Sequence, residues 1–273
     1  AGNTLLFVIM FICGVFMALP LVMIINNALK PLDEIYQFPP KIFVRNPTLE
    51  NFSDLFVLMN SSWVPFSRYI LNTIIITGGG MVGHVLCASL AAYPLAKHSF
   101  PGKNILFGMV VLSMMFSWTV TQIPQYLIIS WLHINNTYAA LILPACSFGM
   151  GLYLMKQFMD GLPMSLVEAA KIDGATSGQI LKNVTIPMVM PSITICTFLT
   201  LTNSFKLFDQ NLALTNGEPS NMSELLALNI FRTFYGRTGW EGVGQAKAVV
   251  FFLLVAAIAL TQNWLTRRKE VQQ

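Results

Sequence analysis

Residues 162–191 read LPMSLVEAAKIDGATSGQILKNVTIPMVMP and interrupt the hydrophobic segments of the chain with a polar stretch. The stretch begins after a break at Gly161-Leu162-Pro163 and continues directly into the next apolar segment at Val184. An otherwise apolar chain most simply keeps such a water-facing element in order to dock a partner on it.

Two helix-capping signals lie within this stretch. A capping box fits two runs, Ser165-Leu166-Val167-Glu168 and Thr176-Ser177-Gly178-Gln179. In such a box a hydroxyl side chain caps the start of a helix, and the acid or amide side chain three residues later bonds back to the backbone of the capping residue. Gly174 lies between them, where a residue that tolerates positive φ would end the first helix. The pattern predicts two short helices joined by a sharp turn, and Pro187 is expected to kink the beginning of the following span.

The composition indicates a membrane protein. Of the 273 residues, 55% are hydrophobic and 10% are charged, and the mean hydropathy is +0.62. An average soluble domain is about 25% charged. A spanning helix needs about 20 apolar residues, and charge-free stretches of that order recur along the chain. They predict six spans, at Leu5–Ile25, Tyr69–Leu95, Ile105–Leu127, Thr137–Met155, Val184–Phe205 and Ala248–Leu265.

These spans are expected to be helices, because backbone groups inside hydrocarbon must be hydrogen-bonded within their own segment. The predicted fold class is therefore an all-α polytopic membrane protein. A β-barrel is excluded because the apolar runs are continuous rather than alternating. The first run lacks a basic n-region and an A-x-A site, so we interpret it as a span rather than a signal peptide. No linker or repeat divides the sequence, and we expect one transmembrane domain over residues 1–273.

Basic residues in short loops indicate the orientation. An even number of spans places both termini on one side of the membrane. The basic residues of that side are dense, at Lys97, Lys103, Lys156, Lys171, Lys182, Arg267, Arg268 and Lys269. On the opposite side they are spread over longer segments rich in acids. We therefore expect both termini and the polar stretch to be cytoplasmic.

The sequence shows no pattern typical of catalysis or metal binding. The four cysteines fall inside predicted spans without C-x-x-C spacing, as apolar fillers commonly do, at Cys13, Cys87, Cys146 and Cys196. The three histidines are scattered, and there is no Walker A, G-x-S-x-G or dinucleotide motif. The net charge of +4 needs no nucleic-acid partner, since topology and anionic head groups explain it. We expect a chain that is not an enzyme and binds no cofactor or metal.

The polar stretch resembles the EAA loop of permease subunits of ABC importers, written E-A-A-x3-G-x9-I-x-L-P. Glu168-Ala169-Ala170, Gly174 and Val184-x-Ile186-Pro187 match its spacing throughout, with two conservative departures, Ile to Val and Leu to Ile. The residues alone fit a second interpretation equally well, a capped re-entrant loop whose Glu168 serves only its own helix. The resemblance favours the interpretation in which this stretch is a docking site for a partner protein.

The resemblance extends over most of the chain. Residues 38–56, 204–231 and 266–271 are similar to the corresponding parts of carbohydrate-type permeases, in particular the shorter, six-span, MalG-like subunit of heterodimeric oligosaccharide importers. FDQNLALT at 208–215 also resembles the longer sister subunits, which leaves the choice of subunit open. The resemblance implies the type I ABC importer permease fold, with its core at about 67–265 and a coupling loop at about 162–187.

What this resemblance implies is a permease subunit that forms half of the pathway for a sugar or oligosaccharide in the inner membrane of a bacterium. Its partners would be a homologous sister permease, two copies of a cytoplasmic ATPase subunit that bind ATP and Mg²⁺, and an extracytoplasmic solute-binding protein. The small alanines would allow close approach to the ATPase, and the carboxylates would meet basic groups there. The implied coupling residues are Glu168, Ala169, Ala170, Asp173, Gly174 and Pro187.

Polar residues inside spans are candidates for the substrate path, because exposing them to lipid is costly. The candidates are five polar residues and one aromatic residue, namely Asn72, Gln122, Asn203, Phe205, Lys206 and Asp209. The alternatives are structural. Asn72 and His84 can bond neighbouring helices, and Lys206 can pair with Asp209 at i+3. Close helix packing is the expected role of the span glycines, Gly78, Gly79, Gly80, Gly83, Gly149 and Gly151.

Other functions stay open at this point. Within the same superfamily, the alternative is an importer for glycerol phosphate or polyols. Outside it are an ion-coupled secondary carrier and an intramembrane enzyme. A carrier should show paired intramembrane charges or inverted repeats, and an enzyme should show clustered reactive residues within spans. The sequence displays neither pattern.

Overall fold

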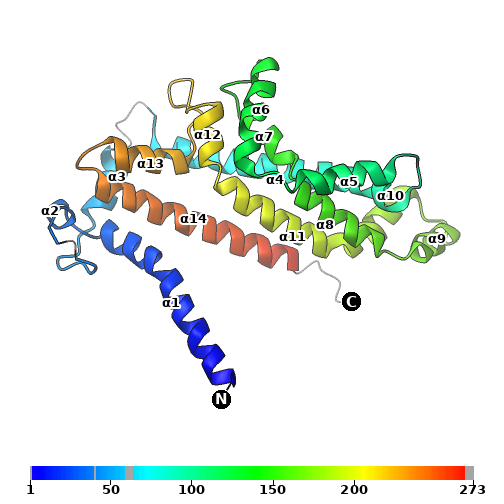
Figure 1. The fold of residues 1–273 in the computed structure, drawn as a ribbon, viewed down its shortest axis with the longest axis horizontal. Coiled ribbons are helices and arrows are strands. Elements are labelled where there is room, and N and C mark those ends of the chain that lie inside the picture. The colour runs from blue at the N-terminus through cyan, green and yellow to red at the C-terminus, as the bar shows by residue number, and fades with distance from the viewer. Residues whose placement is uncertain (1, 40, 59–63, 268–273) are drawn as a thin grey trace. The chain divides into compact units, whose positions relative to one another are not determined.

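The structure is a computed structural model that describes all residues except 1, 40, 59–63 and 268–273 (Figure 1). The described residues form α-helices and one short π-helix, without a strand. The predicted all-α class is therefore confirmed for this part of the chain. Two members of the predicted C-terminal basic cluster, Arg268 and Lys269, lie outside the described residues.

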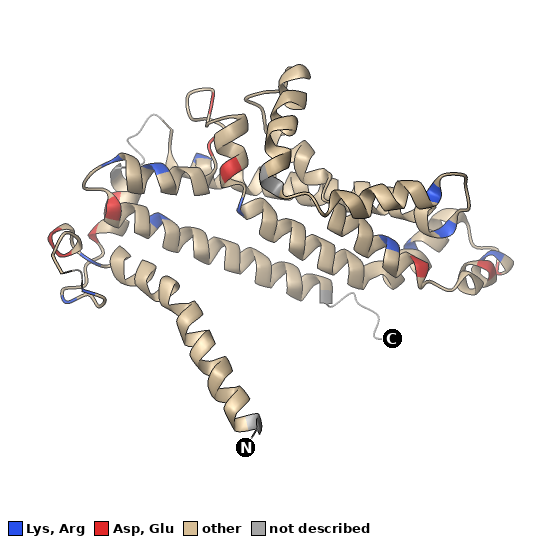
Figure 2. Cartoon of the chain, viewed as in Figure 1, with Lys and Arg blue, Asp and Glu red and all other residues tan. Residues whose placement is uncertain are grey.

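Within the described residues, five helical segments are long and apolar enough to cross a membrane. They correspond to the first, second, fourth, fifth and sixth predicted spans, at Thr4–Ala28, Phe66–Lys97, Tyr138–Asp160, Ser177–Phe205 and Glu241–Thr266. Figure 2 shows that charged residues gather at the ends and connections of the helices and leave long stretches of them uncharged. This distribution is the one expected of helices in hydrocarbon.

The predicted continuous third span over Ile105–Leu127 is wrong. In its place are two helices, α5 (Lys103–Ser113) and α6 (Trp118–Trp131). The hydroxyl of Ser113 donates to the carbonyl oxygen of Val110 at 2.7 Å, and Ser117 takes an extended backbone, with φ −64° and ψ 139°, before α6. At 1.5 Å per residue, α5 alone is roughly 16 Å long, about half the hydrocarbon thickness.

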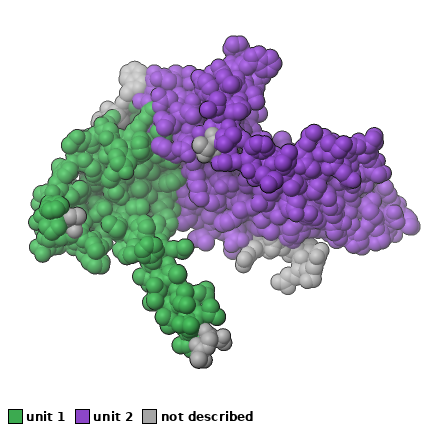
Figure 3. All heavy atoms as spheres, in the orientation of Figure 1, with its two compact units in different colours: residues 1–70, 226–254 green, residues 71–225, 255–273 purple. Residues whose placement is uncertain are grey.

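The described chain divides into two compact units (Figure 3). Unit 1 comprises residues 1–70 and 226–254. It contains α1 (Gly2–Ala28), α2 (Leu32–Ile35), α3 (Glu50–Leu58), α13 (Leu226–Gly236) and the first part of α14 (Glu241–Arg267). Its buried core includes Ala28, Leu55, Tyr69, Leu226, Val243 and Ala246. The side-chain amide of Asn51 donates to the carbonyl oxygens of Ala28 and Lys30, so α3 caps the end of α1.

Unit 2 comprises residues 71–225 and 255–273 and holds the polar stretch. It contains most of α4 (Phe66–Lys97), then α5, α6, α7 (Tyr138–Cys146), α8 (Gly149–Asp160), α9 (Met164–Ile172), α10 (Ser177–Ile180), the π-helix η1 (Leu181–Thr185), α11 (Ile186–Phe205) and α12 (Phe208–Leu214). The predicted fourth span is thus bent into α7 and α8 at Ser147 and Phe148. Helix α8 packs along α11.

Glycines permit the close packing of the unit 2 helices. A Cβ atom built at Gly83 would lie 2.6 Å from Sγ of Cys146 in α7, and one built at Gly151 would collide with the ring of His84 in α4. Nδ1 of His84 lies 3.3 Å from the carbonyl oxygen of Cys146. The predicted roles of these glycines and of His84 in helix contacts are confirmed, whereas a Cβ at Gly78 would meet nothing within 4 Å.

Candidate functional site

The polar stretch forms the predicted helix–Gly–helix element. Helix α9 ends at Ile172, Gly174 has φ +79°, and α10 begins at Ser177. The Gly174 N–H donates to the carbonyl oxygen of Lys171 and the Ala175 N–H to that of Ala170, both at 3.0 Å. A left-handed residue closes the helix in this way most cheaply when it is glycine, which explains Gly174.

Only one of the two predicted capping boxes forms. Oγ1 of Thr176 accepts from the backbone N–H of Gln179, and the side-chain carbonyl of Gln179 accepts from the backbone N–H of Thr176 at 2.8 Å. The predicted box at Ser165 is wrong, because α9 already begins at Met164 with Pro163 as its N-cap. Ser165 therefore lies inside the first turn, and no side chain caps this helix.

The segment presents an exposed surface. Helix α9 has no buried residue, and Glu168, Ala169, Asp173 and Gly174 are exposed while Ala170 is half-buried. Apolar side chains are exposed beside the carboxylates, with 86% of Ile172, 44% of Leu166 and 43% of Met164 accessible. Acidic groups mixed with uncovered apolar side chains are typical of a surface that another protein covers.

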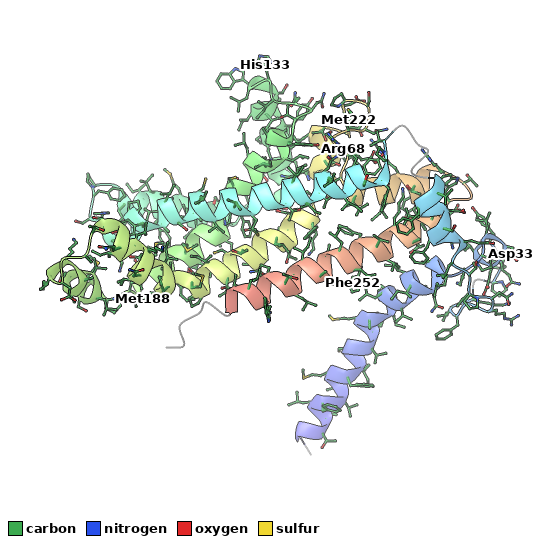
Figure 4. The ribbon with its side chains drawn as sticks, turned by 180° about the vertical axis from the view of Figure 1, so that it is seen from behind. Asp33, Arg68, His133, Met188, Met222 and Phe252 are labelled. Carbon is green, nitrogen blue, oxygen red and sulfur yellow. The ribbon has the colours of Figure 1, made fainter. Side chains whose placement is uncertain are left out.

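Both flanks of this segment are anchored. Nζ of Lys97, the last residue of α4, donates to the carbonyl oxygen of Leu162 at 2.7 Å. Leu162 also packs against a buried cluster formed by Ala92, Met155, Met159, Val189 and Cys196. On the other flank the helical backbone continues without a break from α10 through η1 into α11. Pro187 lies in the first turn of α11, beside Met188, which Figure 4 labels. The flanks of α9 are therefore attached to α4, α8 and α11.

A cavity of about 900 Å³ lies elsewhere in unit 2, between α5, α6, α7, α11 and α12. The polar candidates Asn203, Lys206 and Asp209 line it, and so does Phe116. The structure thus brings three of the predicted substrate-path residues together. Its volume is in the range of small-molecule binding sites.

The other three candidates lie apart from this cavity. Phe205 is buried at 4% exposure, and Gln122 is half-buried on α6; neither lines the cavity. Asn72 is fully buried, donates to the carbonyl oxygens of Met222 and Glu224, and accepts from the hydroxyl of Tyr138. These bonds agree with the structural alternative for Asn72. Lys206 and Asp209 form no ion pair with each other.

Among the cavity-lining polar residues that the sequence did not indicate are Thr200 in α11 and Gln210 in α12. They are 3% and 2% exposed. Nothing in their sequence neighbourhood separates them from ordinary helix-packing residues, since Thr194 and Thr202 on the same helix simply bond their own backbone.

The described residues thus combine five apolar helical segments of membrane-spanning length with an exposed helix–Gly–helix segment ahead of one of them. Residues 84–271 match the family described as binding-protein-dependent transport system inner membrane component. The match covers more than half of the chain, which therefore belongs to this family.

Several relatives are similar to the chain. It is 43% identical over 145 residues to the probable starch degradation products transport system permease protein AmyD of Thermoanaerobacterium thermosulfurigenes, covering 52% of this chain but only 49% of that protein. It is 30% identical over 195 residues to the arabinooligosaccharides transport system permease protein AraQ of Halalkalibacterium halodurans, covering 69% and 67%. The sn-glycerol-3-phosphate transport system permease protein UgpE of Yersinia pestis is 24% identical over 261 residues, covering 95% and 93%.

Two solved structures share the fold. A chain of a bacterial ABC transporter involved in the import of the acidic polysaccharide alginate superposes with a TM-score of 0.80 at 18% identity, covering 95% of this chain and 94% of that one. A chain of the MetNI methionine ABC transporter gives 0.55 at 16% identity, covering 81% and 99%. These similarities extend the fold assignment to the unit 1 residues that precede the family match.

Proposed function

We propose that this chain is one permease subunit of an ATP-driven ABC importer and forms half of the translocation pathway for a sugar or oligosaccharide. The observation that carries the proposal is the exposed element E-A-A-x3-G, whose glycine has φ +79° and whose flanks are fixed to α4, α8 and α11. The carbohydrate assignment is supported by the relatives named for starch degradation products and arabinooligosaccharides.

In the proposed mechanism the segment is the contact with a cytoplasmic ATPase subunit. Ala169 and Ala170 let the ATPase approach closely, and Glu168 and Asp173 offer carboxylates to basic groups on it. Gly174 sets the angle between α9 and α10. Pro187, in the first turn of α11, passes the movement into that span. ATP-driven closure of the ATPase dimer would thus switch the pathway between an inward-facing and an outward-facing opening.

The assembly proposed around this chain contains a homologous sister permease, two copies of the ATPase subunit and an extracytoplasmic binding protein. ATP and Mg²⁺ bind to the ATPase subunits in this proposal, and the chain itself is not catalytic. It crosses the inner membrane six times, with α5 and α6 together making the third crossing and both termini in the cytoplasm. The dense basic residues beside the coupling segment support this orientation.

The substrate path proposed for this subunit is the cavity lined by Asn203, Lys206 and Asp209. A second candidate function, import of a glycerol phosphate or polyol, is favoured by the similarity to UgpE over 95% of the chain. A cationic Lys206 on the cavity wall is compatible with a phosphate.

Coupling is tested with Glu168→Lys and Gly174→Leu in the purified complex reconstituted with its binding protein. Glu168→Lys reverses a charge at the proposed contact, and Gly174→Leu places a side chain at φ +79°. We expect each variant to insert and assemble normally but to lose ATP-driven uptake. Gly178→Ala is the control, since a Cβ there meets nothing within 4 Å. Uptake at the wild-type rate by either variant would show that this segment does not couple ATP hydrolysis to transport.

A further inference from the structure

Three side chains that line the unit 2 cavity have buried polar atoms without a hydrogen-bond partner among the described residues. Gln210 is 2% exposed, and both Nε2 and Oε1 of its amide are unpartnered. Oγ1 of Thr200 and Nε2 of Gln125 are also buried and unpartnered, and both residues line the same cavity. Burying an unsatisfied polar group costs about 1–3 kcal/mol. Several such groups in the lining of one cavity therefore call for an explanation, such as a ligand that bonds to them.

The Thr200 hydroxyl is informative because two threonines on the same helix behave differently. Thr194 and Thr202 donate to the carbonyl oxygens of Met190 and Phe198, four residues earlier, at 3.0 and 2.8 Å. This local bond is available to any helical threonine. The hydroxyl of Thr200 does not make it, although among the serines and threonines of α11 only Ser192 is more deeply buried.

The chemistry of these groups indicates the ligand class. A glutamine amide offers two donor hydrogens and an acceptor oxygen, and a threonine hydroxyl both donates and accepts. Hydroxyl groups of a solute have the same dual character, whereas an anion needs donors and positive charge only. The two charges on the wall, Lys206 and Asp209, are opposite in sign and exposed. Phe116 and Phe148 add aromatic faces to an otherwise apolar lining.

We propose that Thr200 and Gln210, with Gln125, form a solute-binding site within this subunit for a neutral, hydroxyl-rich molecule, and that their hydrogen bonds select it over anionic solutes. The inference rests on the proposed function and deepens it, because it places solute recognition on this chain rather than on its sister permease. It also assigns the recognition to Thr200 and Gln210, which are buried, rather than to Asn203, Lys206 and Asp209, which are exposed.

The test uses the complete transporter in proteoliposomes with its binding protein. Maltotriose and arabinotriose serve as neutral probes, and sn-glycerol 3-phosphate serves as the anionic probe. Thr200→Val and Gln210→Leu remove the polar atoms at nearly constant volume, and Thr202→Val is the matched control on the same helix. We expect uptake of a neutral probe to fall about tenfold in each of the first two variants, equivalent to about 1.4 kcal/mol, and to be unchanged in the control.

Thermal stability without solute separates recognition from packing. Replacing an unsatisfied buried polar group by an apolar one of similar shape is neutral or stabilising, so Thr200→Val and Gln210→Leu should keep or raise the melting temperature. A merely structural role would lower it. Thr200→Ser retains the hydroxyl and should restore uptake, which keeps the test valid if one variant fails to assemble.

The inference is overturned if both variants transport the neutral probe at the wild-type rate. It is also overturned if the wild-type complex transports sn-glycerol 3-phosphate but neither oligosaccharide. Failure of the proposed function gives a different result: ATP hydrolysis by the wild-type complex would not respond to the binding protein at all. Retained stimulation of ATP hydrolysis in the variants, together with lost uptake, supports the site.

Discussion

Nζ of Lys97 donates a hydrogen bond of 2.7 Å to the carbonyl oxygen of Leu162, which ties the end of α4 to the residue before the N-cap of α9. The ammonium group also lies in the last turn of α4, where a positive charge interacts favourably with the helix dipole. One side chain therefore fixes the start of the polar stretch at 162–191 to a long apolar helix.

We predict that Lys97→Met lowers the amount of solute imported per ATP hydrolysed by roughly two- to fivefold, because a hydrogen bond from a charged donor contributes about 1.5–3 kcal/mol. Methionine keeps the apolar stem, so assembly should be normal. Uptake and ATP hydrolysis measured on the same proteoliposomes give the ratio. Lys103→Met is the control for lost charge, since Nζ of Lys103 lies 3.5 Å from its acceptor, the carbonyl oxygen of Ala96. An equal effect of both substitutions would refute a specific role for the Lys97 bond.

Thr176→Ala should loosen α10, whereas Ser165→Ala should leave α9 unchanged. Thr176 caps its helix reciprocally with Gln179, and such a cap contributes about 1 kcal/mol. Ser165 caps nothing. Hydrogen exchange followed by mass spectrometry should show faster exchange of the amides of Gln179 and Ile180 in Thr176→Ala only. Faster exchange in α9 of Ser165→Ala would mean that the serine does support its helix.

Asn72→Leu should destabilise unit 2 by roughly 1–3 kcal/mol, because it leaves the carbonyl oxygens of Met222 and Glu224 without this donor. Met222 lies in the connection between α12 and α13 (Figure 4), 150 positions away in the sequence, so the bond closes a long loop. Tyr138→Phe removes a single bond to Asn72 and should cost less. The melting temperature of the purified complex measures both effects, and a larger loss for Tyr138→Phe would contradict this ranking.

Gly151→Ala should destabilise the packing of α8 against α4. The added methyl group would collide with the His84 ring, and overpacking of this kind costs about 1–3 kcal/mol. Gly108→Ala on α5 is the control, because a Cβ there meets nothing within 4 Å. Adding His84→Ala to Gly151→Ala should restore part of the lost melting temperature. If the double variant is less stable than the sum of the single changes, the ring is not the source of the strain.

The sequence was sufficient where local chemistry decides the structure. The turn at Gly174 and the cap at Thr176 depend on neighbouring residues only, and both were predicted. The box at Ser165 failed because Pro163 provides the extended N-cap residue two positions earlier. Hydropathy predicted where apolar segments lie but did not reveal the break at 114–117, since no proline or glycine marks it.

The polar residues of the cavity could be identified only from the tertiary structure. Thr200 and Gln210 belong to different helices, and only the packing of the helices brings both into the lining of one cavity. The same limit explains Asn72, which looked like a substrate-path candidate because it is polar within a span. Its partners lie 66, 150 and 152 positions away, beyond the reach of any local pattern.

The π-helix at Leu181–Thr185 affects how a change in the number of residues would alter the direction of α10 relative to α11. A π-turn accommodates one more residue than an α-turn. Deleting one residue there would return the backbone to a regular α-helix and leave the direction of α10 relative to α11 nearly unchanged, because the π-turn accommodates its extra residue locally. A deletion in the first turns of α11 would instead rotate everything before it by about 100°, since an α-helix has 3.6 residues per turn. The direction in which α10 and Gly174 point thus tolerates the loss of one residue within Leu181–Thr185 but not within the following helix.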